Sequence, residues 1–285
     1  ELLVQRGVTS VEDAERFFNP RLKYLHDPFL MPDMQKAVDR LNRAMGAKEK
    51  IMVYGDYDVD GTTAVALVYK YLSNFYSNID YFIPTRYEEG YGISSDIIDD
   101  FAGQGVKLVI ILDCGIKANE EIAHAREHGI DFIICDHHVP DQELPEAVAI
   151  LNPKMPGSTY PCPHLSGCGV GYKLMQAFAI SNGIQQNELE GMLDLVAVSI
   201  AADIVPMVDE NRIMAFYGLR RLNTNPNMGL RAIIRICNLS NREISERLGI
   251  SQSTVENHMY AALKQLRRKL SKEQLLLLLA LLFMR

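Results

Sequence analysis

Five short apolar runs, separated by stretches with helical spacing, constrain the fold of this chain more than any other feature. The runs lie at 51–54, 79–83, 107–112, 131–135 and 147–151. Apolar residues recur at helical spacing in the intervening stretches 62–74, 94–104 and 118–128. Apolar runs of about five residues that alternate with helical stretches of roughly 10–15 residues indicate βαβ units. The pattern therefore predicts an α/β fold with a mainly parallel, doubly wound sheet.

Helical patterns occupy most of the remaining chain. Within the first fifty residues, the stretch 33–45 has apolar positions at helical spacing. After the sheet region, helices are predicted at 169–182, 188–202, 212–223 and 229–236. We therefore expect three parts, namely a helical N-terminal segment at 1–50, an α/β domain at 51–237 and a tail at 238–285.

Acidic and imidazole side chains follow three of the predicted strands, at the points where these strands end. They are Asp56, Asp58 and Asp60 after the first strand, Asp113 after the third, and Asp136, His137 and His138 after the fourth. Ligands of such sheets bind beyond the carboxyl ends of the strands, so we expect these side chains to converge. A single aspartate there is commonly a helix N-cap, and a histidine pair on a loop is commonly solvated. Three aspartates within five residues, however, repel one another unless a cation neutralises them.

The spacing of the first three carboxylates suggests how they could meet. In an extended segment Asp56, Asp58 and Asp60 would share one face, and Gly61 would allow a sharp turn into the helix that follows. Asp203 is a further candidate, because the run 199–206 around it is mainly apolar and a lone carboxylate there would be costly. Oxygen ligands with one or two imidazoles suit Mn²⁺ or Mg²⁺ better than structural zinc. Two such ions can activate a water and stabilise the leaving oxygen of a phosphoryl displacement.

Three further features are candidates for ligand contacts. In the glycine-rich helix start at 166–173, Ser166, Gly167, Gly169 and Lys173 could bind a phosphate, with plain helix packing as the alternative. Arg86, near Tyr87 and Tyr91, could hold a backbone phosphate beside stacked bases, with a solvated loop as the alternative. Cys162, His164 and Cys168 only loosely resemble a zinc knuckle, because a fourth ligand is not evident.

The motifs at the strand ends carry a family resemblance. The run 55–61, Asp113, the Asp-His-His run at 136–138 and Asp203 resemble the four motifs of the DHH phosphoesterase superfamily. The sequences of the segments 53–64, 25–29 and 89–92 resemble those of the RecJ-type single-strand-specific exonucleases, which belong to this superfamily. The resemblance covers residues 1 to about 237. It implies a metal-dependent, 5′-to-3′ hydrolysis of single-stranded DNA in recombination and repair.

The resemblance also assigns roles to residues. It implies that the chain binds two Mn²⁺ or Mg²⁺ ions and that Asp113 bridges them. The implied ligands are Asp56, Asp58, Asp60, Asp113, His137 and Asp203. His138 would contact the scissile phosphate, and Asp136 would orient a neighbouring imidazole. Other DHH phosphodiesterases that cleave short oligonucleotides, cyclic dinucleotides or pyrophosphate remain an alternative. RecJ-type enzymes would continue after about residue 237 into a second domain, whose place the tail takes here.

The tail differs from the rest of the chain in charge and pattern. The chain has a net charge of −7, yet residues 239–285 contain 8 basic and 4 acidic side chains, which suggests a basic module on an acidic body. A short helix at 240–248, a turn at 249–251 and a longer helix from 252 form a helix-turn-helix pattern. The second helix carries polar side chains that could reach DNA, namely Gln252, Ser253, Thr254, Asn257 and His258. A helical hairpin that packs on the body is the alternative.

The tail has a resemblance of its own. Residues 242–258 resemble the promoter-reading fourth region of small sigma factors and LuxR-type regulators. This resemblance implies duplex DNA as a possible second partner. It also raises a second hypothesis, in which the chain is a helix-turn-helix DNA-binding protein whose phosphoesterase domain is inactive.

Cysteine usage and hydropathy predict the compartment. The five cysteines have no regular spacing, and the N-terminus shows no secretory segment, which favours a cytoplasmic location. The apolar run 275–283 is nine residues long, about half of what a membrane span requires. We therefore expect no membrane partner.

Overall fold

The computed structural model describes residues 3, 8–85, 92–237 and 251–253. The chain divides into two compact units, 1–227 and 228–285, which are described separately. The N-terminal segment belongs to the same compact unit as the α/β region, and 228–237 belongs to the second unit. Within the described residues, no helix is long and apolar enough to cross a membrane.

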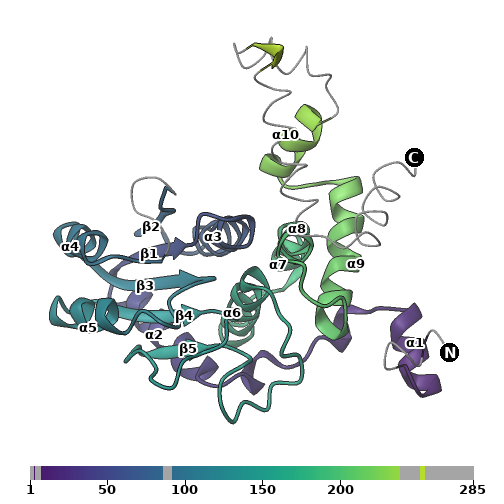
Figure 1. The fold of residues 1–285 in the computed structure, drawn as a ribbon, viewed down its shortest axis with the longest axis horizontal. Coiled ribbons are helices and arrows are strands. Elements are labelled where there is room, and N and C mark those ends of the chain that lie inside the picture. Colours follow the sequence, from purple (N-terminus) through teal and green to yellow (C-terminus); the bar gives the residue numbers. More distant parts are fainter. Residues whose placement is uncertain (1–2, 4–7, 86–91, 238–250, 254–285) are drawn as a thin grey trace. The chain divides into compact units, whose positions relative to one another are not determined.

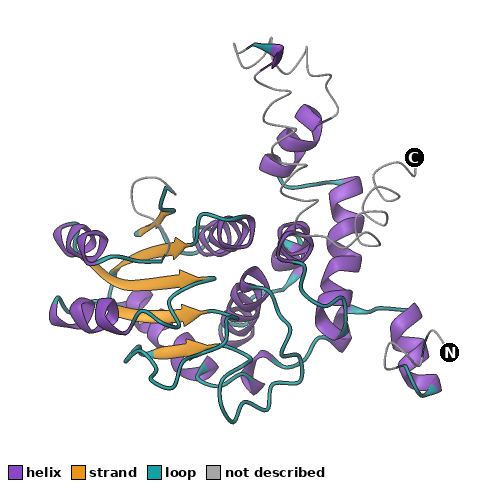
Figure 2. Ribbon diagram, in the orientation of Figure 1, coloured by secondary structure: helices purple, strands orange, loops and turns teal. Residues whose placement is uncertain are grey.

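A five-stranded parallel sheet forms the centre of the first unit (Figures 1 and 2). Its strands are β1 (Lys50–Gly55), β2 (Ile79–Phe82), β3 (Val106–Leu112), β4 (Asp131–Cys135) and β5 (Ala149–Leu151). The strands are paired in the order β2-β1-β3-β4-β5, and all four pairings are parallel. The predicted α/β fold with a parallel sheet is confirmed.

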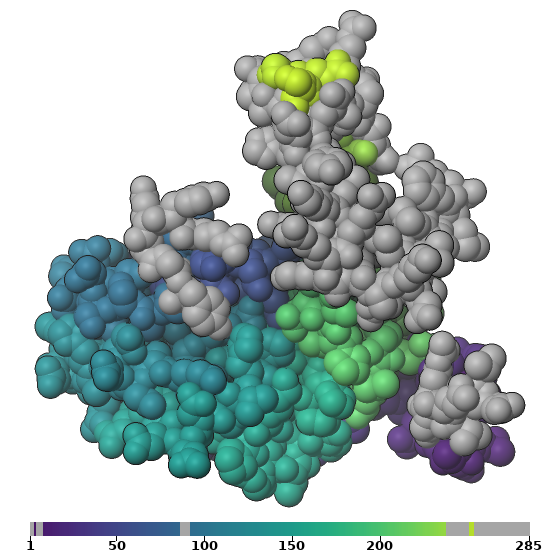
Figure 3. Space-filling model, viewed as in Figure 1, coloured from purple at the N-terminus to yellow at the C-terminus, as the bar shows by residue number. Residues whose placement is uncertain are grey.

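Helices cover both faces of the sheet (Figure 1). α4 (Ser95–Gly103) and α5 (Asn119–Glu127) cover one face, where Ile98, Phe101 and Ile122 pack with Val109, Phe132 and other alternate strand residues. α2 (Met34–Gly46), α3 (Val59–Leu72) and α6 (Gly167–Ser181) contact the strands on the other face. In the space-filling view, the blue part of the chain, which follows residue 50 on the bar, lies directly against the teal part (Figure 3). From β1 the chain first adds β2 on one side of the sheet and then β3 on the other, with α3 and α4 on opposite faces. The strand order therefore reverses between β1 and β3, and such sheets bind ligands at this point.

Three helices follow the glycine-rich start of α6. They are α7 (Asn187–Glu190), α8 (Leu193–Asp203) and α9 (Asp209–Thr224). The single helix predicted at 188–202 is therefore wrong, because the chain leaves the helix at Gly191 and Met192. Asp194 then lies buried in the first turn of α8, where its Oδ2 accepts a hydrogen bond from the Asn227 amide at 2.6 Å. This buried bond links the first turn of α8 to Asn227.

The N-terminal segment is helical, as predicted, but it consists of several short pieces. They are α1 (Val11–Phe18), the 3₁₀ turns η2 (Leu22–Tyr24) and η3 (Pro28–Leu30), and α2. A capping box between Ser10 and Asp13 starts α1, and the Arg212 guanidinium of α9 lies 3.7 Å from the centre of the Phe17 ring. The described part of the second unit contains the helix α10 (Met228–Cys237).

The crossing of α8 and α9 gives a testable prediction. A Cβ at Gly218 of α9 would lie 2.1 Å from the Leu193 carbonyl oxygen and 2.6 Å from the Ala197 Cβ. Gly218→Ala would force the two helices apart, so we expect the free energy of unfolding to fall by about 1–3 kcal/mol in urea titrations. Gly46→Ala is the control, because its added Cβ meets no atom within 4 Å. Equal stability of the two variants would contradict the prediction.

Candidate metal centre

The carboxylates after β1 do not lie in an extended segment, because α3 begins earlier than predicted. Asp58 is the N-cap of α3 and accepts a hydrogen bond from the Gly61 amide at 2.9 Å, while Asp60 already lies in the first helical turn. Gly61 is therefore helical, and a Cβ there would lie 2.4 Å from the carbonyl oxygen of Asp56. The expectation that strand alternation aligns the three carboxylates is wrong. A tight strand-to-helix turn, in which a side chain at position 61 would clash with the backbone of Asp56, instead places Asp56 and Asp58 near Asp113 and places Asp60 near His137 and Asp203.

Asp60 is held by the N-terminus of α6. The carboxylate is 1% exposed and accepts hydrogen bonds from the amides of Gly167 at 2.7 Å and Cys168 at 2.8 Å. A third bond comes from the hydroxyl of Ser199 in α8, at 2.7 Å. Burial raises the pKa of Asp60, and these hydrogen bonds oppose the rise. The positive end of the α6 dipole thus binds an internal carboxylate.

Asp113 lies directly after β3 in a strained backbone conformation. Its φ is 61°, in the left-handed region that few non-glycine residues adopt and that is common at functional sites. The residue is 2% exposed. Burial, followed by the nearby charges of Asp60 and Asp58, raises the pKa of Asp113 to about 10. A Cβ at Gly167 would lie 2.6 Å from both Cβ and Oδ1 of Asp113, so glycine is needed for this approach.

His137 lies among three carboxylates. Its Nε2 is 3.1 Å from Asp113 Oδ1 and 3.7 Å from both Asp60 Oδ2 and Asp203 Oδ2. Among the described residues, neither its ring nitrogens nor Asp113 Oδ1 has a hydrogen-bond partner, although all are buried. Asp203 itself is exposed at the end of α8. The expected costly apolar setting of Asp203 is therefore wrong, because its apolar chain neighbours do not enclose it.

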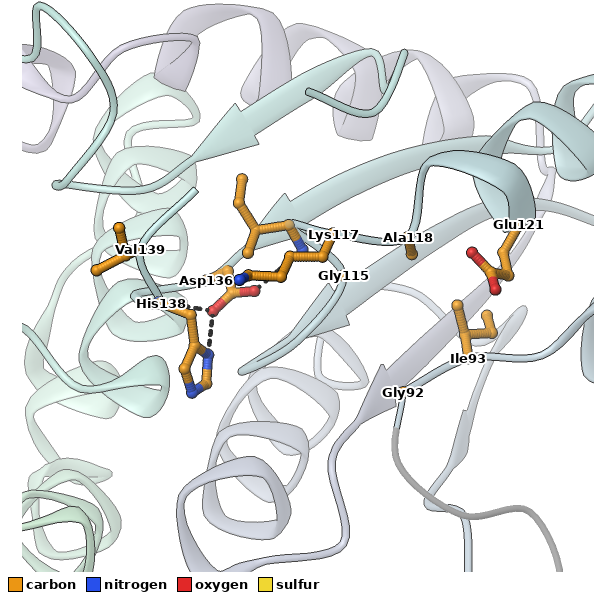
Figure 4. A pocket seen from close by; sticks show the side chains of 10 residues that line it. Gly92, Ile93, Gly115, Lys117, Ala118, Glu121, Asp136, His138 and Val139 are labelled. Atoms are coloured by element: carbon orange, nitrogen blue, oxygen red, sulfur yellow. Dashed lines mark hydrogen bonds and ion pairs between the residues drawn. The ribbon is translucent and has the colours of Figure 1, made fainter. Parts of the chain in front are cut away.

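Asp136 positions His138 rather than lining the centre. Its Oδ1 accepts hydrogen bonds from the amides of His137 and His138 and lies 2.7 Å from Nδ1 of His138, while Oδ2 accepts from the Ile116 amide at 3.1 Å. Figure 4 shows the Asp136 carboxylate beside the His138 ring. Burial acts to raise the pKa of Asp136, but the hydrogen bonds from His138 outweigh it and lower the pKa. The same hydrogen bond raises the pKa of His138.

The site residues fit a divalent cation. Ligand atoms that lie within 4.8 Å of one another form three overlapping groups, namely Asp56–Asp58–Asp113, Asp60–His137–Asp203 and Asp113–His137–His138. Asp113 and His137 each belong to two groups. Buried polar atoms are normally hydrogen-bonded. Asp113 Oδ1 and the ring nitrogens of His137 form no hydrogen bond with any described residue, and Asp113 Oδ1 and His137 Nε2 only approach each other at 3.1 Å, as two ligands of one cation would. Carboxylate oxygens with imidazole suit Mn²⁺ and Mg²⁺.

The glycine-rich segment does not present its donors to an external phosphate. Ser166 caps α6 by accepting from the Gly169 amide at 3.1 Å, and the Gly167 amide is bonded to Asp60. Lys173 is 0% exposed, and its ammonium donates to the His26 carbonyl oxygen at 2.6 Å and to Glu210 Oε1 at 3.0 Å. The expected phosphate contacts of Ser166, Gly167, Gly169 and Lys173 are therefore corrected. Their polar groups are buried and serve internal partners, as the packing alternative required.

Some predicted residues cannot be placed. Arg86, Thr254, Asn257 and His258 lie outside the described residues. Gln252 and Ser253 are exposed in a short described stretch, and their contact with DNA remains a prediction. Among the described residues, the loosely zinc-like set at 162–168 does not group into a metal site.

Ser199 is a site residue that the sequence analysis missed. It is fully buried, and its hydroxyl donates to Asp60 and lies 2.6 Å from the hydroxyl of Ser166. Ser199 and Asp203 are four residues apart on α8, so they share one helix face. This four-residue spacing from Asp203 is the sequence signal that could have identified Ser199 as a site residue.

The pair of Asp136 and His138 gives a second testable prediction. Asp136→Asn removes the charged acceptor, so we expect the pKa of His138 to fall towards the ordinary histidine value in NMR titrations of the metal-free protein. Asp141→Asn is the control, because Asp141 forms an exposed ion pair with Lys117. An unchanged pKa of His138 in Asp136→Asn would show that this hydrogen bond does not set it.

Comparison with known proteins relates this site to a family. Residues 50–200 match the model of the DHH family, N-terminal domain, and residues 233–266 match that of sigma-70, region 4. The single-stranded-DNA-specific exonuclease RecJ of Bacillus subtilis is 42% identical over 82% of this chain and 29% of its own length. RecJ of Escherichia coli is 35% identical over 83% of this chain and 42% of its own length. The chain thus spans less than half the length of these relatives.

Solved structures show the same fold. A crystal structure of exonuclease RecJ bound to manganese superimposes with a TM-score of 0.68 at 28% identity, covering 77% of this chain and 55% of that one. RecJ of Thermus thermophilus, in complex with Mn²⁺, gives a TM-score of 0.67 at 24% identity, covering 88% of this chain and 33% of that one. With a family model that matches more than half of its residues, and with its acidic motifs at the ends of β1, β3 and β4, the chain belongs to the DHH family.

Proposed function

We propose that this chain carries the metal-dependent phosphodiesterase centre of a RecJ-type exonuclease, which removes nucleotides from the 5′ end of single-stranded DNA in recombination and repair. The main support is the convergence of carboxylates and imidazoles at the ends of β1, β3 and β4. The proposed substrate follows the relatives, which are named single-stranded-DNA-specific exonucleases.

The proposed ligands of two Mn²⁺ or Mg²⁺ ions are Asp56, Asp58, Asp60, Asp113, His137 and Asp203. Asp113 is the proposed shared ligand, because it belongs to one group with Asp56 and Asp58 and to another with His137. Related RecJ structures are described as complexes with Mn²⁺ and Mg²⁺. When bound, such ions supply an activated water and stabilise negative charge on the reacting phosphate.

His138 is the proposed contact to the scissile phosphate. Its side chain is 45% exposed, and the hydrogen bond that its Nδ1 donates to Asp136 favours the protonated form of His138, which can donate a proton to a phosphate oxygen. A pocket of about 480 Å³ opens beside it (Figure 4), lined also by Gly92, Ile93 and Lys117. This volume lies in the range of small-ligand sites, so the pocket has room for the departing nucleotide.

Hydrolysis assays of the full chain test the proposal. With Mn²⁺, we expect the unmodified chain to release mononucleotides from 5′-labelled single-stranded DNA and Asp113→Ala to release none. Asp39→Asn, which changes an exposed carboxylate on α2, should behave like the unmodified chain. Faster cleavage of a dinucleotide, a cyclic dinucleotide or pyrophosphate would favour another DHH activity. Undiminished activity of Asp113→Ala would sink the assigned centre.

The tail supports a second, separate proposal. Residues 233–266 match sigma-70 region 4, so we propose that the tail binds duplex DNA. Gel shifts of the full chain with duplex DNA, compared with Gln252→Ala/Asn257→Ala, test this. Equal retention of duplex by both proteins would contradict it. If only duplex binding and no hydrolysis were found, the chain would be a DNA-binding protein with an inactive phosphoesterase domain.

We also propose a cytoplasmic location. All five cysteines belong to the described residues and all are free thiols, four of them buried, which suits a reducing compartment. Fractionation of cells that produce the tagged chain would test this, and recovery in a secreted or membrane fraction would contradict it.

A further inference from the structure

Two histidines at the end of α5 face one aspartate of α4. His124 Nε2 lies 2.8 Å from Asp99 Oδ1, and His128 Nε2 lies 3.3 Å from the same oxygen. The two imidazole rings are 4.7 Å apart between their centres. The histidines are four residues apart, so they project from one side of the helix end. Two imidazole nitrogens thus converge on one carboxylate oxygen.

This arrangement fits a cation better than a simple ion pair. One nitrogen from each histidine and one oxygen of Asp99 lie within 4.8 Å of one another. Nitrogen and oxygen ligands bound at about 2.0–2.1 Å to a tetrahedral zinc ion are about 3.3 Å apart. The distance between His128 Nε2 and Asp99 Oδ1 already has this value. The shorter distance between His124 Nε2 and Asp99 Oδ1 is that of a hydrogen bond, which a bound cation would replace.

We propose that Asp99, His124 and His128 bind a borderline divalent cation, represented by Zn²⁺, at a site separate from the candidate metal centre. Two imidazoles with one carboxylate favour zinc, nickel or copper, whereas the oxygen-rich centre suits Mn²⁺ or Mg²⁺. The position also differs. α5 runs back from the end of β3 to the start of β4, so its last turn lies towards the amino edge of the sheet, opposite Asp113.

The surroundings favour a positive ion that joins two helices. α4 contains three aspartates and no basic residue. All three ligand side chains are partly exposed, so a cation and its remaining water ligands can reach them. A bound cation would tie α4 to α5 on the sheet face that both cover, and it would stabilise the folded chain because the ligands are assembled only there.

Zinc binding to the full chain tests the site. In equilibrium dialysis we expect His124→Gln to lose one bound zinc equivalent, with an affinity at that site reduced by more than about tenfold. Even the mutation of a residue that only contacts a metal ligand lowers metal affinity by about 10–100-fold. His164→Gln, an exposed histidine elsewhere, is the control and should keep all equivalents. Cu²⁺ bound to the unmodified chain should show coupling to two imidazole nitrogens in its EPR spectrum, and His128→Gln should show fewer.

The outcome separates this site from the proposed function. The three residues lie outside the candidate centre, so Mn²⁺-dependent hydrolysis by His124→Gln should equal that of the unmodified chain. Equal zinc stoichiometry and affinity in His124→Gln, His128→Gln and the control would overturn the second site, whatever the hydrolysis assay shows. Loss of hydrolysis by Asp113→Ala with zinc binding at this site retained would support both assignments.

Discussion

Asp113→Asn is expected to raise the melting temperature of the metal-free protein and to abolish metal-dependent hydrolysis. Asp113 is buried, and this burial, followed by the nearby charges of Asp60 and Asp58, raises its pKa. Asparagine keeps the shape and tolerates the left-handed backbone at φ 61°. It has no ionisable group, so the folded chain no longer has to take up a proton at this position. The same change removes a proposed shared ligand, so metal binding and hydrolysis should fall by at least about a hundredfold.

The sign of the pH dependence makes the test sharper. Because the folded-state pKa of Asp113 is raised, its contribution to stability is complete below its ordinary value of 3.8 and is lost as the pH rises towards the folded-state value. The gain from Asp113→Asn should therefore grow with pH in metal-free protein. Each kcal/mol gained in the free energy of unfolding corresponds to about 2–4 °C in melting temperature.

Thermal unfolding with and without Mn²⁺ at several pH values measures both effects. The unmodified chain should gain stability on adding Mn²⁺, and Asp113→Asn should gain little. Asp141→Asn serves as the control for removal of an exposed carboxylate. A lower melting temperature of metal-free Asp113→Asn, or an unreduced response to Mn²⁺, would contradict the description of the cluster.

Gly167→Ala is expected to damage the candidate centre without changing any ligand. The new methyl group would lie 2.6 Å from Cβ and Oδ1 of Asp113, so either Asp113 or the start of α6 must move. Moving α6 would lengthen the hydrogen bonds that the amides of Gly167 and Cys168 donate to Asp60. We expect a loss of about 1–3 kcal/mol in the free energy of unfolding and a weakened affinity for Mn²⁺.

Urea unfolding and Mn²⁺ titration of Gly167→Ala provide the measurement. Gly103→Ala is the matched control, because Gly103 also lies at a helix end and its added Cβ meets no atom within 4 Å. If Gly167→Ala bound Mn²⁺ as tightly as Gly103→Ala does, the contact between α6 and Asp113 would not shape the centre.

The strand ends show how far periodicity reaches. The apolar runs predicted each strand to within about two residues, and they placed the acidic motifs after β1, β3 and β4. The family resemblance, and not the spacing, supplied the full ligand set. The prediction from local sequence failed where a candidate metal ligand also begins a helix. Asp58, for example, caps α3, and Gly61 is already helical, so the extended segment expected at 56–60 does not form.

The order of helices and strands, and the acidic residues at the strand ends, follow from the sequence alone, because hydrophobic periodicity and helix caps act over a few residues. Tertiary structure alone decided the partners of the buried polar groups. Ser199 meets Asp60 across 139 residues, and Lys173 meets the His26 carbonyl across 147. Burial removes water from these groups, so each must find a partner wherever the fold brings one, and no local pattern specifies that partner. Thus the sequence indicated where a metal centre would lie, whereas packing decided that the start of α6 binds Asp60 instead of a phosphate.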